Sequence, residues 1–151
     1  MRSSVADLAS RHGRIALDSN VLIYVLESTG FEADRASEIL DVIESGTVIG
    51  TIATIGLTEA LTGPARDGDG ARFELMATEL RAIRNLRLVE LRPEIAVDAA
   101  WLRGTGPMGL ADAVHVATAR ASGASALVTN DRRIRSGSGL EVVYLSDLVA
   151  P

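Results

Sequence analysis

Short apolar segments with strand character alternate with helical or polar segments along most of the chain. The strand-like segments are rich in Val, Ile, Leu and Thr, and turn residues or helical stretches separate them. They cover residues 14–17, 47–52, 86–91, 126–129 and 141–145. Parallel strands need crossover connections, which are usually helices. We therefore expect an α/β fold, a three-layer α/β/α sandwich with a mainly parallel five-stranded sheet.

The connecting segments show apolar residues at helical spacing or a typical helix start, such as Pro93. We expect helices over residues 20–26, 33–43, 55–61, 73–83, 93–102 and 111–121. The stretch TGPARDGDGA (62–71) contains a proline and three glycines and predicts the clearest loop. A chain of 151 residues favours one domain, which we place at residues 14–151 after an N-terminal extension at residues 1–13.

Composition excludes several classes of protein. The chain has no cysteine, so disulfides, thiolate metal sites and cysteine nucleophiles are excluded, and two histidines are too few for a histidine-based zinc site. The net charge of −5 argues against a surface built to hold polyanions. We find no run of about 18 uncharged apolar residues and no secretory signal, and therefore expect no membrane partner and a cytoplasmic location.

Four acidic residues lie in unusually apolar surroundings. Asp18 directly follows the first predicted strand and Asp131 follows the fourth, whereas Glu59 and Asp112 lie in small apolar helical segments. Ligand sites in open parallel sheets lie beyond the carboxyl ends of the strands. Taken singly, Asp112 could equally cap its helix, and Glu59 could lie on a solvated helix face. Taken together, four acids in apolar settings would each need separate compensation, which favours a shared site.

A shared site of this composition favours a hard divalent cation. Clustered carboxylates repel one another, and Mg²⁺ or Mn²⁺ binds oxygen ligands from a few carboxylates while it keeps several waters. Such an ion lowers the pKa of bound water and stabilises charge on phosphate oxygens. The acidic residues therefore indicate metal-assisted hydrolysis of a phosphodiester more than zinc chemistry.

The same residues lie in motifs that resemble a known family. The segments LDSNVLIYVL, TEAL, LADAVHVATA and LVTNDRRI contain Asp18, Glu59, Asp112 and Asp131 in that order. The chain resembles PIN-domain proteins over about residues 14–146, specifically the VapC-like toxins of bacterial type II toxin–antitoxin systems. Two departures are the residues before the first strand and Ile134, which stands where an aromatic side chain is frequent.

The resemblance implies an endoribonuclease that depends on Mg²⁺ or Mn²⁺ and hydrolyses RNA with metal-activated water. Its catalytic and metal-binding residues would be Asp18, Glu59, Asp112 and Asp131. Residues that orient the carboxylates or waters would be Ser19, Asn20, Thr129 and Asn130, although Ser19 could simply cap the helix after Asp18. Either Asn130 or Asp131 could point inward, and family spacing favours Asp131. The implied partners are RNA, a cognate antitoxin protein and a second copy of the chain in a homodimer.

Other residues support weaker expectations. Arg132, Arg133 and Arg135 follow Asp131 and could contact substrate phosphates. His115 lies one turn after Asp112, and we expect a packed or orienting residue in preference to a general base. The apolar segments 21–26 and 39–43 are candidates for the antitoxin groove or dimer contact, or equally for the core. Trp101 and Met108 are expected in the core or an interface.

Alternative functions remain at this stage. A haloacid dehalogenase phosphatase needs a second aspartate where this chain has Asn20, and a receiver domain needs a lysine, which the chain lacks. Both are disfavoured. A non-catalytic binding module, with acids that only cap helices, and a PIN nuclease of RNA maturation without an antitoxin stay open.

Overall fold

The computed structural model describes residues 2–137 and 139–151, in which helices and strands alternate. In chain order the elements are α1 (Val5–Arg11), β1 (Arg14–Leu17), α2 (Ser19–Glu27), α3 (Phe31–Glu44), β2 (Ile49–Ala53), α4 (Ile55–Arg66), α5 (Gly70–Arg81), β3 (Leu86–Val89), α6 (Pro93–Thr105), α7 (Leu110–Ala121), β4 (Ala126–Thr129), β5 (Glu141–Tyr144) and the 3₁₀ turn η1 (Leu145–Asp147).

All strand pairs in the sheet are parallel. The described residues form one five-stranded sheet in the order β3-β2-β1-β4-β5, which confirms the expected α/β fold. The central strand β1 pairs on one side with β2 and on the other with β4, so that Leu17 lies opposite both Ile52 and Val128. All five strands therefore end at the same edge of the sheet.

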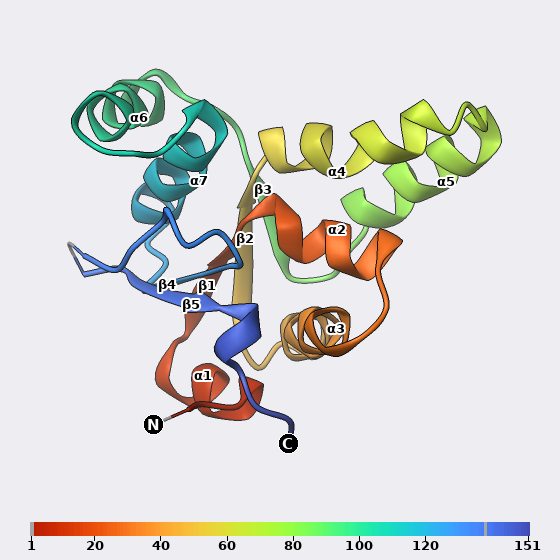
Figure 1. The fold of residues 1–151 in the computed structure, drawn as a ribbon, viewed down its shortest axis with the longest axis horizontal. Helices are drawn as coiled ribbons and strands as arrows, with labels where there is room; N and C mark the ends of the chain where they lie inside the picture. The colour runs from red at the N-terminus through yellow and green to blue at the C-terminus, as the bar shows by residue number, and fades with distance from the viewer. Residues whose placement is uncertain (1, 138) are drawn as a thin grey trace.

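Helices cover both faces of this sheet (Figure 1). Helices α6 and α7 lie on one face, and α2, α3, α4 and α5 lie on the other. The alternation along β1 matches these two layers, because Ile15 and Leu17 join the core beneath α2 and α3 while Ala16 faces the α7 side. Burial on both faces explains why the three central strands β1, β2 and β4 are mostly apolar, whereas the edge strands β3 and β5 are less buried.

The N-terminal extension contains helix α1, whose structure the sequence left open. Ser4 and Asp7 form a capping box at its start. Val5 and Leu8 are buried in the main core, and the Val149 N–H donates to the Ser3 carbonyl at 3.0 Å. The extension therefore packs against the domain, where the two chain ends lie near each other (Figure 1).

The largest error of the sequence prediction is the loop expected at residues 62–71. Helix α4 continues through Gly63 and Pro64 to Arg66, and α5 begins at Gly70, which leaves only a short turn. Pro64 is buried, and a Cβ at position 63 would lie 2.1 Å from Glu27 Oε1 on α2. Close packing of α4 against α2 thus overrides the weak helical preference of this stretch.

The remaining helix and strand boundaries agree with the prediction to within a few residues. Of the two residues expected in the core or an interface, Met108 packs against buried residues, whereas Trp101 is 71% exposed on α6 and does not belong to the core of this chain. Ile39 and Ile43 are fully buried and belong to the core of this chain. No helix in the described part of the chain has the length and apolar character needed to cross a membrane.

Candidate active site

The fold brings the four predicted acidic residues to the carboxyl edge of the sheet. Asp18 follows β1 directly, and Asp131 lies two residues after the end of the neighbouring strand β4. Glu59 lies on α4, which leaves this edge after β2, and Asp112 lies in the first turn of α7, which starts at this edge and returns to the beginning of β4. Four separate segments therefore contribute one carboxylate each.

Asp18 is a buried carboxylate that accepts hydrogen bonds from three residues. It is only 4% exposed and is the N-cap of α2, where it accepts the Ser19 N–H at 2.7 Å. Its other oxygen accepts from Thr129 Oγ1 at 2.7 Å and from Asn20 Nδ2 at 3.3 Å. Asp18 thus caps a helix and also lies in the acidic site, and its neighbours fix its orientation.

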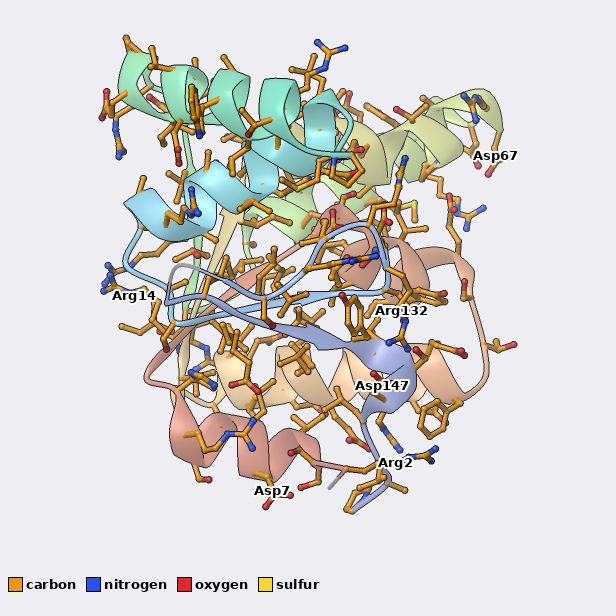
Figure 2. The ribbon with its side chains drawn as sticks, turned by 60° about the vertical axis from the view of Figure 1, so that its left-hand side comes forward. Arg2, Asp7, Arg14, Asp67, Arg132 and Asp147 are labelled. Atoms are coloured by element: carbon orange, nitrogen blue, oxygen red, sulfur yellow. The ribbon has the colours of Figure 1, made fainter. Side chains whose placement is uncertain are left out.

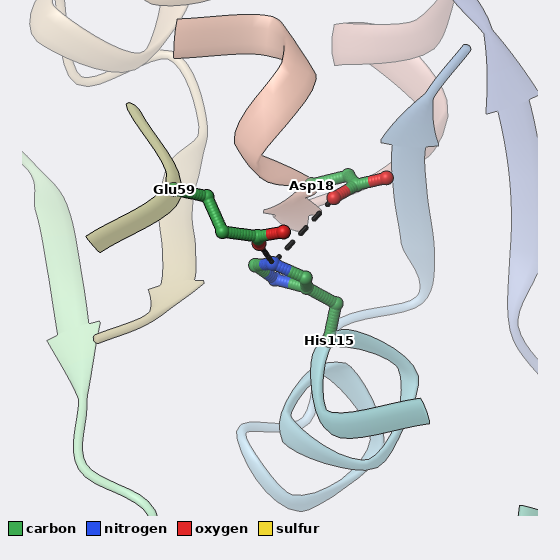
Figure 3. A group of neighbouring side chains, drawn as sticks. All are labelled: Asp18, Glu59 and His115. Carbon is green, nitrogen blue, oxygen red and sulfur yellow. Dashed lines mark hydrogen bonds and ion pairs between the residues drawn. The ribbon is translucent and has the colours of Figure 1, made fainter. Parts of the chain in front are cut away.

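His115 lies between two of the acids (Figure 3). It is 2% exposed on α7, and its Nε2 lies 2.8 Å from Glu59 Oε1 and 3.5 Å from Asp18 Oδ1. The His115 hydrogen bond lowers the pKa of Glu59 more than burial raises it. These three residues each offer a potential ligand atom within 4.8 Å of the others. The prediction of a packed histidine near the site is confirmed, but its central position was not foreseen. The sequence did contain a signal for it, because Asp112 and His115 are three residues apart on one helix and such residues lie on the same face.

Arg133 binds the other two acids. Its Nη2 lies 2.7 Å from Asp131 Oδ2 and 3.3 Å from Asp112 Oδ2, and its backbone N–H and Nε also donate to Asp131. The Arg133 hydrogen bond is the main cause that lowers the pKa of Asp131. A contact of Arg133 with substrate phosphates stays a prediction, and in this structure the side chain contacts carboxylates.

Asp112 connects the two halves of the site electrostatically. Its pKa is raised, first by burial and then by the negative charges of Asp131 and Asp18, while Arg133 acts in the opposite direction. A raised pKa of this origin means that the carboxylates repel one another across a short distance. The cluster is therefore incompletely neutralised by the side chains around it.

The remaining predicted site residues lie beside this cluster. Asn130 donates to Tyr24 Oη and accepts the Ser146 N–H, so it points away from the acids, and Asp131 is the residue that faces Asp112. Thr129 contacts Asp18 and also accepts the Asp131 N–H. Other residues bind elsewhere or are exposed: Arg132 pairs with Asp147, and Arg135 is exposed.

The chemistry of this site fits a hard divalent cation. Its donor groups are carboxylate oxygens, which Mg²⁺ and Mn²⁺ prefer. Burial, and after it repulsion by Asp131 and Asp18, raises the pKa of Asp112, and a bound cation would offset both effects on its charge. Asn20 Oδ1 and His115 Nδ1 are buried polar atoms at the site that have no hydrogen-bond partner among the described residues. A buried acceptor beside clustered carboxylates is an arrangement that a bound cation and its waters would satisfy.

Comparison with known proteins gives a family and a shared fold. The sequence profile of the family described as PIN domain matches residues 15–140. No curated protein matches the chain.

Three solved structures illustrate the shared fold. VapBC2 from Rickettsia felis, bound to a promoter DNA fragment, aligns with a TM-score of 0.66 and 18% identity over 87% of this chain and 98% of that one. FitAcB from Neisseria gonorrhoeae aligns with a TM-score of 0.67 and 19% identity over 89% and 99%. VapC20 from Mycobacterium tuberculosis, described as a toxin that cleaves the sarcin-ricin loop, aligns with a TM-score of 0.59 and 17% identity over 75% and 86%.

Proposed function

Because this chain belongs to the PIN domain family, we propose that it is a Mg²⁺- or Mn²⁺-dependent endoribonuclease that acts as the toxin of a toxin–antitoxin pair. The observation that carries the proposal is the meeting of four carboxylates from four separate segments at the carboxyl edge of the sheet. The family and the toxin relatives make RNA the favoured substrate.

In this proposal Asp18, Glu59, Asp112 and Asp131 hold the metal, directly or through water. When bound, the ion would lower the pKa of a water molecule and offset charge on the phosphate oxygens of the RNA backbone. We propose Mg²⁺ or Mn²⁺ because the four proposed ligands are carboxylates, whose oxygens these ions prefer.

The surrounding residues of the chain would keep these carboxylates in place. Thr129 and Asn20 donate to Asp18, and the Ser19 N–H fixes its other oxygen. His115 Nε2–H donates to the Glu59 carboxylate from a buried position on α7. Such partners orient metal ligands, and their loss typically costs about 10- to 100-fold in metal affinity or activity.

The test is cleavage of single-stranded RNA by purified protein with Mg²⁺. We expect cleavage by the wild type, and we expect Asp112→Asn to remove it while circular dichroism and the unfolding transition show a folded protein. Asp41→Asn, an exposed acid on α3, is the matched control and should cleave normally. Full activity of Asp112→Asn would exclude Asp112 from the mechanism, and no cleavage by the wild type would contradict the proposal.

The proposed partners are a cognate antitoxin and a second copy of the chain. Support comes from relatives of the same fold that were solved as toxin–antitoxin assemblies, among them one from Klebsiella pneumoniae. The residues of the segment 21–26 that are not fully buried, such as Tyr24 and Val25, are candidates for a groove contact. A short open reading frame beside that of this chain, whose product co-purifies with it and blocks cleavage, would support the antitoxin. An active chain with no such neighbour would instead favour a nuclease of RNA maturation.

A further inference from the structure

Arg133 is bound to the acidic site by several contacts although its side chain is largely exposed. The side chain is 61% exposed, yet its Nη2 bridges Asp131 Oδ2 at 2.7 Å and Asp112 Oδ2 at 3.3 Å. Its Nε lies 3.1 and 3.2 Å from the two oxygens of Asp131. A guanidinium that contacts two acids from the solvent side can leave without disturbing the core, because no buried packing holds it.

The neighbouring Arg132 provides a useful contrast. Its guanidinium forms a two-point contact with Asp147 at 2.8 and 2.9 Å, donates to Ser146 and lies 4.1 Å from the centre of the Tyr144 ring. Figure 2 shows Arg132 and Asp147 close together beside the C-terminal turn. Arg132 is therefore occupied by partners outside the acidic site, and of the two arginines Arg133 is the one that contacts Asp112 and Asp131.

We propose that Arg133 is a built-in counter-ion of Asp112 and Asp131, and that a divalent cation must displace it to bind there. This inference rests on the proposed function, because it assumes that these carboxylates are metal ligands. Arg133 would then hold the acids together in the metal-free protein and lower the apparent affinity for metal. Once displaced, its fork of donors would lie at the site edge, free to contact a phosphate of the substrate.

Arg133 Nη2 and a divalent ion cannot both contact Asp112 Oδ2 and Asp131 Oδ2. Mg²⁺ contacts its oxygen ligands at about 2.0–2.1 Å and requires near-octahedral geometry with several waters. Arg133 Nη2 already occupies the space facing Asp112 Oδ2 and Asp131 Oδ2. Bringing a divalent ion to the same two oxygens would place like charges within a few ångströms of each other, which is unfavourable. The carboxylates therefore exchange one cation for the other.

The first experiment measures Mn²⁺ affinity by isothermal titration calorimetry in about 0.15 M salt, which limits long-range charge effects to about 8 Å. We expect Arg133→Gln to bind Mn²⁺ about threefold to tenfold more tightly than the wild type, the range for loss of a solvent-exposed paired contact with two acids. Arg133→Lys keeps the charge without the planar fork and should give a smaller gain.

Two control variants remove the same unit charge from the same segment. Arg132→Gln loses a guanidinium that pairs with Asp147, and Arg135→Gln loses an exposed one. Neither should change Mn²⁺ affinity by as much as twofold. Equal gains in all three glutamine variants would mean a general effect of charge and would overturn the exchange. The exchange is likewise overturned if Arg133→Gln binds Mn²⁺ as the wild type does or more weakly.

The second experiment follows Arg133 directly in the wild type, by the NMR signal of its Nε–H during titration with Mg²⁺. This group donates to Asp131 in the metal-free structure, so its signal should move as the site fills, in step with the calorimetric affinity. An unmoved signal at saturating Mg²⁺ would overturn the inference alone. If the wild type binds neither metal, the metal-dependent function fails first and the exchange fails with it, so the two failures can be told apart.

Discussion

The two edges of the β-sheet each hold a buried or half-buried histidine between polar side chains, but they balance charge in different ways. At the amino edge, His12 contacts Ser125 Oγ at 2.7 Å and Glu141 at 2.6 Å, and Arg11 contacts the same glutamate at 3.0 Å. One acid there has two basic partners. The charge of Glu141 is therefore balanced by neighbouring side chains. These contacts also join the N-terminal extension to the starts of β4 and β5.

The carboxyl edge has the opposite balance. His115 contacts Glu59 and Asp18 with one ring nitrogen, and its other nitrogen is buried with no partner in the described part of the chain. Asp112 and Asp131 share one guanidinium. Four acids thus face one arginine and one histidine, and the pKa of Asp112 is raised. The comparison shows that ion pairs balance the acid at the amino edge, whereas the acids at the carboxyl edge outnumber their basic partners and leave an excess of negative charge.

The largest expected effect concerns stability at the amino edge. Leu8 of α1 is 1% exposed, so Leu8→Ala should lower the free energy of unfolding by about 2–5 kcal/mol through lost burial and a cavity. Leu75→Ala, at a 59% exposed leucine of α5, is the matched control and should change it by less than about 0.5 kcal/mol. Urea unfolding measures both. Equal effects would show that the extension does not contribute to the core.

The next effect separates the two edges by metal binding. Loss of a residue that only orients a metal ligand weakens metal binding by up to about 100-fold. Asp18→Asn removes a proposed charged ligand itself, so it should weaken Mn²⁺ binding by more than about 100-fold. Glu141→Gln removes the acid of the amino edge and should leave Mn²⁺ affinity within about twofold, since Glu141 lies with Arg11 and His12 at the other edge. Calorimetric titration decides it, and a similar loss in both variants would contradict the contrast.

A third prediction uses the opposite pKa shifts of Glu59 and Asp112 in the metal-free protein. The pKa of Glu59 lies below its ordinary 4.5, so its carboxylate stabilises the fold above pH 4.5, and this contribution is lost as the pH falls through the folded pKa. The pKa of Asp112 lies above its ordinary 3.8, so its charge destabilises the fold at neutral pH, and this cost disappears as the pH falls through the raised pKa.

At pH 7 in EDTA, Glu59→Gln should therefore lower the free energy of unfolding by about 1 kcal/mol. Asp112→Asn should raise it by roughly 0.5 kcal/mol. Both differences from the wild type should shrink as the pH is lowered toward 4, as followed by urea unfolding at a series of pH values. A lower free energy of unfolding for Asp112→Asn than for the wild type at pH 7 would show that the charge of Asp112 does not destabilise the fold.

The smallest expected effect returns to the amino edge. Arg11 and Glu141 are each 43% exposed, so Arg11→Gln should lower the free energy of unfolding by only about 0.2–1 kcal/mol. RNA cleavage and Mn²⁺ affinity should not change, because Arg11 contacts Ser3 and Glu141, away from the four acids. A loss of cleavage in a fully folded Arg11→Gln protein would remove the functional distinction between the edges.

Much of the fold and the identity of the clustered acids could be predicted from the sequence. The strand at 126–129 and the helix beginning at Pro93 follow from local preference and pattern, and they appear where expected. The helix through Pro64 could not be predicted, because its stability comes from packing against α2. A periodic pattern also could not decide between the core and an interface for Trp101, whose exposed side chain on α6 excludes the core of this chain.

The sequence by itself determined the parallel α/β architecture and the four acids in apolar surroundings, because the alternation of strand and helix patterns and the neighbours of each acid are local properties of the chain. Only the tertiary structure decided their partners. His115 joins Glu59 to Asp18 across 56 and 97 residues, and whether Asn130 or Asp131 faces the cluster depends on contacts with Tyr24 and Ser146. Such pairings depend on distances between segments remote in the chain, which no local pattern encodes.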